Sequence, residues 1–177
     1  MDDRGVNERL AALTAAGTSV WLDQIQRDLI TSGELQRLVD ELSLRGVTSN
    51  PTIFNQAILG SDDYDEQLAE LATQGLGTRE IYQELAIADI RAACDVLRPV
   101  FDATGGADGF VSLEVDPDLA FDTQRTIEQA RDYWDRVDRP NVMIKIPGTE
   151  PGIPAIEEMI AEGCHVNVTL LFGIEQY

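Results

Sequence analysis

The stretch Asn141-Val142-Met143-Ile144-Lys145-Ile146-Pro147-Gly148-Thr149 decides how this 177-residue chain is interpreted. Its apolar residues are typical of a strand, yet it contains Lys145, the only lysine among the 13 basic residues. Side chains alternate between the two faces of a strand, so Lys145 is expected opposite Ile144 and Ile146. Lysine is seldom fully buried without a partner. Lys145 is therefore either an edge lysine that points into water or an interior amine with a chemical task.

An interior lysine would have a definite chemistry. Removal from water disfavours the charged form of an amine. The neutral amine is a nucleophile that attacks a carbonyl carbon and forms a Schiff base. The segment alone does not separate this interpretation from the edge-strand one, and the neighbouring segments are needed to do so.

Strand-like and helix-like segments alternate along the chain. Strands are expected over residues 18–23, 46–50, 110–115, 142–146 and 165–172. Helices are expected from Ser32, as an N-cap, and over 64–72, 80–100, 122–137 and 154–161. This alternation indicates βαβ units and a parallel sheet. The strands are so apolar that we expect both faces of the sheet to be covered.

Polar side chains come at or near the C-terminal ends of the expected strands. In α/β folds that edge of the sheet carries the ligand site. The pattern predicts a (β/α)8 TIM barrel of which about the first five strands are present, with a doubly wound sheet as the competing architecture. No Gly-x-Gly-x-x-Gly follows the first strand, which weakens the second option for a dinucleotide-binding protein. The polar residues concerned are Asp23, Thr48, Asn50, Glu114, Lys145, Asn167 and Thr169.

The length conflicts with a complete barrel. A TIM barrel takes roughly 250 residues, whereas this chain has 177. It also stops at Gly173-Ile174-Glu175-Gln176-Tyr177, which is typical of a first helical turn without continuation. We therefore expect residues 1–177 to form a single partial TIM-barrel domain, from a fragment or truncated product.

Composition excludes some function classes. The net charge of -19 and the isoelectric point near 4.1 argue against binding to nucleic acid, which needs a basic surface. No apolar run reaches membrane-spanning length, and Met1-Asp2-Asp3-Arg4-Gly5 is not a signal peptide. These features predict a cytoplasmic protein that contacts neither nucleic acid nor membrane; a homo-oligomer is left open.

The cysteines and the histidine are too few for a metal site. Cys94 and Cys164 lie far apart and match no metal-binding spacing. We expect them to be buried free thiols, with a single disulfide between them left open. His165 is the only histidine, which argues against a histidine-based metal site or a histidine–serine relay.

Imine chemistry at Lys145 would need groups that move protons, because the carbinolamine hydroxyl must be expelled as water. Glu114 lies on the preceding strand and is a candidate for this transfer. Thr169 lies on the following strand and could hold a water. Asp23 supplies a second carboxylate for proton exchange with the substrate.

Other polar residues suit a sugar, and each candidate also has a structural interpretation. The amides of Asn50 and Asn167 can bond to hydroxyl groups. Asn50 before a proline is also a common helix start, Glu114 could cap a loop, Asp23 could cap a helix and Thr169 could be an ordinary strand residue. The coincidence of all of them on successive strand ends favours a functional site.

Three segments resemble transaldolase, a member of the Schiff-base class I aldolase superfamily. Gly46-Val47-Thr48-Ser49-Asn50-Pro51-Thr52-Ile53-Phe54 is similar to the family's Thr-Ser/Thr-Asn-Pro signature, and residues 142–155 are similar to its active-site lysine signature. Asn167-Val168-Thr169-Leu170-Leu171-Phe172 is a third match. The resemblance extends from about Ser19 to the end of the chain.

The resemblance implies a role for each catalytic candidate. Lys145 would form a Schiff base with the C2 carbonyl of a ketose phosphate. Asp23 would accept the hydroxyl proton as the carbon–carbon bond breaks. Glu114, with a water positioned by Thr169, would carry the protons of imine formation and hydrolysis.

The resemblance also implies the substrates and the setting. Asn50 and Asn167 would bind the dihydroxyacetone moiety, and Thr48 would line the pocket. The family transfers this unit from fructose 6-phosphate, or sedoheptulose 7-phosphate, to an aldose phosphate in the pentose phosphate pathway. It uses no metal or cofactor, because the protonated imine is the electron sink.

The match leaves three alternatives open. The family's phosphate-binding serine and arginines come from later strands, so no residue here is assigned to them, and the chain could be a catalytically inert fragment. A fructose-6-phosphate-aldolase-like enzyme is the nearest rival, but that group resembles this chain with a tyrosine in place of Glu114. A binding module with an incidental lysine is the third alternative, and the two long motifs argue against it.

Overall fold

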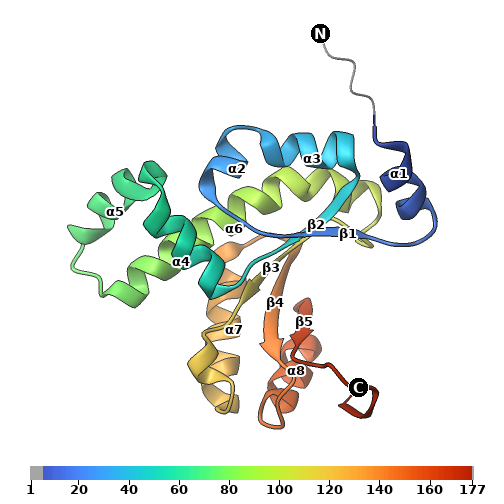
Figure 1. The fold of residues 1–177 in the computed structure, drawn as a ribbon. Helices are drawn as coiled ribbons and strands as arrows, with labels where there is room; N and C mark the ends of the chain where they lie inside the picture. The colour runs from blue at the N-terminus through green and yellow to red at the C-terminus, as the bar shows by residue number, and fades with distance from the viewer. Residues whose placement is uncertain (1–5, 177) are drawn as a thin grey trace.

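The computed structural model describes residues 6–176 and contains a five-stranded parallel sheet with the order β1-β2-β3-β4-β5. Residues 1–5 and residue 177 lie outside the described part. The prediction that residues 1–5 are not a signal peptide therefore also falls outside it. The sheet curls into a half-barrel (Figure 1), which confirms the expected partial TIM barrel. The strands are β1 Val20–Asp23, β2 Leu44–Thr48, β3 Phe110–Glu114, β4 Val142–Pro147 and β5 Val166–Thr169.

Helices connect each strand to its neighbour, as parallel pairing requires. Within residues 6–176 no helix is long and apolar enough to cross a bilayer. The helices are α1 Glu8–Ala15, α2 Arg27–Thr31, α3 Glu34–Leu42, α4 Pro51–Gly60, α5 Asp65–Ala72, α6 Thr78–Ala103, α7 Thr123–Val137 and α8 Gly152–Ala161, and the 3₁₀ turns are η1 Asp62–Tyr64, η2 Pro117–Leu119 and η3 Ile174–Gln176.

Within the described part of the chain, helices cover one face of the sheet. Helices α3, α6, α7 and α8 pack on the strands, while α4 and α5 extend beyond the end of β2 (Figure 1). The core of the covered face is apolar, with Val47, Val111, Ile144 and Ile146 all inaccessible to solvent. The expected burial on both faces is confirmed for β3 and β4, where Ser112 and Lys145 on the opposite face are buried, although helices cover only the apolar side among the described residues.

Several boundaries differ from the expected ones for local reasons. Strand β2 begins at Leu44 and ends at Thr48, because Ser49 and Asn50 already lead into α4. The expected N-cap Ser32 was wrong: Gly33 takes that position with a φ of 81°, and Ser32 ends α2. Helices α1 and α2 were not expected, whereas a helix start at Asn50 was among the interpretations left open. Helix α4 begins at Pro51, since proline suits the first helical turn.

The uncovered face is closely packed at one point between β1 and β2. Trp21 is the register partner of Gly46, and its indole lies directly over that glycine. A Cβ atom at Gly46 would come within 2.2 Å of the indole ring. Any larger residue at position 46 would therefore displace Trp21.

The cysteines and the histidine have structural positions. Cys94 and Cys164 are both free and buried, as expected. Burial, with a smaller contribution from Asp95, raises the pKa of the Cys94 thiol to about 12, so this thiol stays protonated. The His165 ring packs edge-on against Phe110 and Trp134, with centroids 5.1 and 5.8 Å away.

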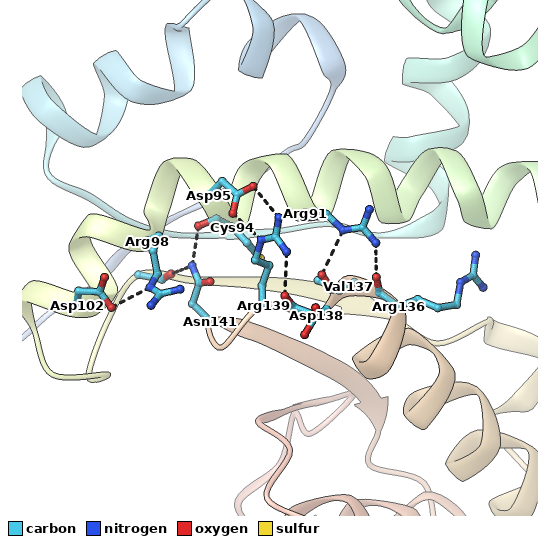
Figure 2. Close-up of polar contacts among 11 residues, drawn as sticks. Arg91, Cys94, Asp95, Arg98, Asp102, Arg136, Val137, Asp138, Arg139 and Asn141 are labelled. Carbon is cyan, nitrogen blue, oxygen red and sulfur yellow. Dashed lines mark hydrogen bonds and ion pairs between the residues drawn. The ribbon is translucent and has the colours of Figure 1, made fainter.

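A polar cluster fixes the start of the lysine strand (Figure 2). The Nε of Arg91 on α6 donates to the carbonyl of Val137 at 3.3 Å, and another guanidinium nitrogen donates to the carbonyl of Arg136. These carbonyls end α7, where a cation is favourable. Arg139 pairs with Asp95 of α6 at 2.5 Å. Helix α6 thus holds the connection that leads into β4.

Asn141 completes this cluster from a fully buried position. Its Nδ2 atom donates to the carbonyls of Cys94 and Gly109, each at 2.9 Å (Figure 2). One amide therefore joins α6, the segment before β3 and the start of β4. Because Lys145 follows on the same strand, this contact also sets the position of the lysine along the sheet.

We predict that Asn141→Ala lowers the free energy of unfolding by about 3 kcal/mol, because it leaves two buried carbonyls without their donor. Arg98→Ala is the control, from the helix α6 to which Asn141 bonds, since the Arg98–Asp102 pair is exposed and should contribute less than about 1 kcal/mol. Urea unfolding followed by circular dichroism measures both. Equal losses in the two variants would contradict the proposed role of Asn141.

Candidate active site

Strand register brings the polar candidates to neighbouring levels of the uncovered face. Glu114 of β3 is aligned with Lys145 of β4, which is aligned with Asn167 of β5. Residues in register on parallel neighbours share a face of the sheet. Thr48 and Asp23 are aligned with each other one level away. The uncovered face therefore carries the candidates from all five strands.

Lys145 is an interior residue with only 9% of its surface exposed. Its Nζ donates to the main-chain carbonyl of Ser49 at 2.8 Å and to Oε2 of Glu114 at 3.2 Å. The edge-strand interpretation of Lys145 is therefore wrong, and so is the loop-cap interpretation of Glu114. An amine and a carboxylate in direct contact are suitable for proton exchange.

A second group of hydrogen bonds surrounds Ser112, a fully buried residue of β3. Asn167 donates from Nδ2 to the Ser112 hydroxyl at 3.0 Å. The Ser49 hydroxyl donates to the Ser112 carbonyl at 2.9 Å. Sequence reasoning named neither serine as a site residue. The signal for Ser49 was its place in the Thr-Ser-Asn-Pro motif, between Thr48 and Asn50. The signal for Ser112 was its place two residues before Glu114.

Thr169 has an unusual environment. Its Oγ1 atom is buried, and it has no hydrogen-bond partner among the described residues. A buried hydroxyl without a partner is costly unless a water or ligand satisfies it. Thr169 is in register with Pro147, two residue pairs beyond Lys145 and Asn167, and this position is compatible with a water near the amine.

Asn50 has a structural role that the sequence left open. It is the N-cap of α4, and its Oδ1 accepts a hydrogen bond from the Ile53 amide at 3.0 Å. The cap uses only the oxygen, while the side-chain amide carries two further donors. Thr48, the last residue of β2, is half-buried. The helix-start interpretation of Asn50 is thus confirmed, and it leaves the NH₂ group available for a ligand.

Asp23 lies at the exposed end of β1, apart from the hydrogen bonds of Lys145. It does not cap the next helix, because the N-cap of α2 is Gln26. It lines a cavity of about 570 Å³ together with Arg27 and Tyr64. Arg27 is engaged by Asp89 at 2.9 Å and stacks over Tyr64, so its guanidinium is held by the protein itself.

Tyr82 is a neutral group near the carboxylates. Burial, followed by the charges of Asp116 and Glu114, raises the pKa of its phenol to about 12. Burial and then Asp116 also raise the pKa of Tyr133, which donates to Asp116 at 3.2 Å. Both phenols therefore stay protonated near neutral pH.

Curated relatives share most of this sequence. A transaldolase from Frankia alni is 55% identical over 168 residues, covering 95% of this chain and 45% of the relative. A transaldolase from Mycobacterium marinum is 52% identical over 171 residues, covering 97% and 46%. A transaldolase 2 from Nostoc punctiforme is 52% identical over 161 residues, covering 91% and 42%.

These relatives are longer than this chain, which spans a little under half of their length. The model of the family described as transaldolase/fructose-6-phosphate aldolase matches residues 20–177, from β1 to the end. The match includes every residue of the site. The chain therefore belongs to the transaldolase/fructose-6-phosphate aldolase family.

Proposed function

We propose that this chain carries the Schiff-base half of a transaldolase site, which transfers a dihydroxyacetone unit from a ketose phosphate to an aldose phosphate. The observation that supports the proposal is the contact between the shielded Lys145 amine and the Glu114 carboxylate at 3.2 Å. We also propose that residues 1–177 form one partial-barrel domain.

The first step is imine formation. The nitrogen of Lys145 adds to the C2 carbonyl carbon of fructose 6-phosphate or sedoheptulose 7-phosphate and gives up a proton. Glu114 carries this proton and returns it to the carbinolamine hydroxyl, which leaves as water. A water bonded to Thr169 completes the relay. The Oγ1 of Thr169, buried and without a hydrogen-bond partner among the described residues, supports this role.

The second step breaks the carbon–carbon bond. Asp23 accepts the proton of the substrate's C4 hydroxyl, and the electrons of the C3–C4 bond move into the protonated imine. The imine is thus the electron sink, and this chemistry needs no metal or cofactor. An aldose phosphate departs, and a second aldose phosphate takes the three-carbon unit by the reverse steps. Asp23 is the exposed last residue of β1 and is in register with Thr48 on the face that carries Lys145, which suits a residue that meets the substrate.

Substrate binding in this chain involves neutral groups. Asn50 and Asn167 bond to the hydroxyls of the dihydroxyacetone unit, and Thr48 lines the pocket. The hydrogen bond from Asn167 to Ser112 orients its amide, which supports such a role. We propose no phosphate-binding residue here. The expected setting, by likeness to the family, is the pentose phosphate pathway in the cytoplasm.

Borohydride trapping tests the proposal. The chain is incubated with fructose 6-phosphate or dihydroxyacetone, reduced, and analysed by intact mass and peptide mapping. We expect one adduct at Lys145, the sole lysine of the sequence. Lys145→Arg should show none, because a guanidinium does not form the imine. A folded wild-type chain without an adduct at Lys145 would contradict the proposal.

Glu114→Gln should slow imine formation by about 100-fold, since an amide cannot carry the proton, and general acid–base catalysis contributes at least that factor. Its half-saturating dihydroxyacetone concentration should stay near that of wild type. Trapping rates measured over a range of concentrations give both values. An equal loss of affinity and rate would count against the relay and favour a binding role.

Thr169→Val removes a hydroxyl that has no partner among the described residues, and keeps the shape of the side chain. The free energy of unfolding should therefore stay within about 1 kcal/mol of wild type or rise. Imine formation should slow by roughly tenfold if the hydroxyl holds the relay water. Unchanged trapping kinetics would remove Thr169 from the mechanism.

A further inference from the structure

The connection between β2 and α4 approaches the lysine amine most closely. Ser49 follows the last residue of β2, and its main-chain carbonyl oxygen lies 2.8 Å from Nζ of Lys145. This is shorter than the 3.2 Å contact with Glu114. The nearest acceptor of the amine is therefore a main-chain atom. The sequence does not reveal this contact, because every residue has a main-chain carbonyl.

Three constraints hold this carbonyl in place. The Ser49 side chain is only 1% exposed, and its hydroxyl donates to the Ser112 carbonyl at 2.9 Å. Asn50 is fixed as the N-cap of α4, and Pro51 restricts the backbone before it. The peptide unit that bonds to Lys145 is thus anchored on its N-terminal side by a serine hydroxyl and on its C-terminal side by a helix start.

The two acceptors of Lys145 differ in what they can do. A carboxylate such as Glu114 can accept and return a proton. A peptide carbonyl accepts a hydrogen bond but does not take up a proton near neutral pH. The Ser49 carbonyl can therefore orient the amine throughout the reaction, while Glu114 is left to move protons.

We propose that Ser49 is a positioning residue for Lys145: its hydroxyl, fixed on the Ser112 carbonyl, holds the peptide unit whose carbonyl orients the lysine amine. The catalytic consequence of this role rests on the proposed function. The positioning of the amine by Ser49 does not rest on the proposed function, because it concerns contacts within the unliganded chain.

The orientation of the amine can be measured directly. Selective ¹⁵N labelling of lysine gives a single side-chain nitrogen signal, because the sequence contains one lysine. Hydrogen exchange at this nitrogen should be slow in the wild-type chain. In Ser49→Ala it should be roughly tenfold faster, the factor that corresponds to one hydrogen bond of ordinary net strength. Ser49→Thr, which keeps the hydroxyl, should restore slow exchange.

Thr126→Val is the matched control. The buried Thr126 hydroxyl also donates to a carbonyl, that of Leu119, at 2.9 Å, but outside the contacts of Lys145. This variant should have a lower free energy of unfolding, but hydrogen exchange at the lysine nitrogen should be as slow as in the wild-type chain. Exchange as slow in folded Ser49→Ala as in wild type would overturn the proposal. If Ser49→Ala does not fold, Ser49→Cys provides the test, because a thiol is a weaker donor of similar size. A smaller increase in the exchange rate at the lysine is then expected. No increase in that rate would overturn the proposal.

Trapping then tests the consequence for chemistry. Ser49→Ala should form the reduced adduct with dihydroxyacetone about tenfold more slowly at saturation, with a similar half-saturating concentration. A wild-type chain that forms no adduct would refute the proposed function, while the exchange measurement would still decide the role of Ser49. Faster exchange without slower trapping would limit that role to the resting amine and overturn its part in catalysis.

Discussion

A lysine amine that has left water must find hydrogen-bond acceptors, and much of this fold follows from that requirement at Lys145. With 9% of the residue exposed, its acceptors are supplied by the end of β2 and by Glu114 of β3. Both acceptors reach the amine only if three strands run parallel and in register. That register depends in turn on helices packed against the opposite, apolar face of the sheet.

The sequence predicted those features that repeat along a strand or helix. The alternation of Ile144, Lys145 and Ile146 placed the lysine opposite the apolar face, and the structure bears this out. It could not predict that the nearest acceptor is the Ser49 carbonyl, because every residue has such an atom and only the tertiary fold decides which one is used. The same holds for Asn141, whose two carbonyl partners belong to α6 and to the segment before β3.

Local patterns in the sequence are poor predictors where tertiary contacts prevail. The apolar strands predicted burial on both faces of the sheet, which holds for β3 and β4, but the inner face combines Trp21 and Met143 with polar groups and has no second layer of helices among the described residues. The arginines also act through tertiary contacts that the sequence alone does not indicate. Although they are few in a chain of net charge -19, Arg27, Arg91 and Arg139 hold helices and loops together through carboxylates and carbonyls. Their charge supports the framework of the half-barrel.

The packing of Trp21 over Gly46 has an optical consequence. The chain contains two tryptophans, and they lie on opposite sides of the sheet. Trp21 is on the inner face with Met143 and Asn167, whereas Trp134 of α7 contacts the His165 ring. Indole emission depends on the polarity around the ring. The two fluorophores therefore report separately on the inner face and on the helical layer, and a molecule bound within the half-barrel changes the emission of one and spares the other.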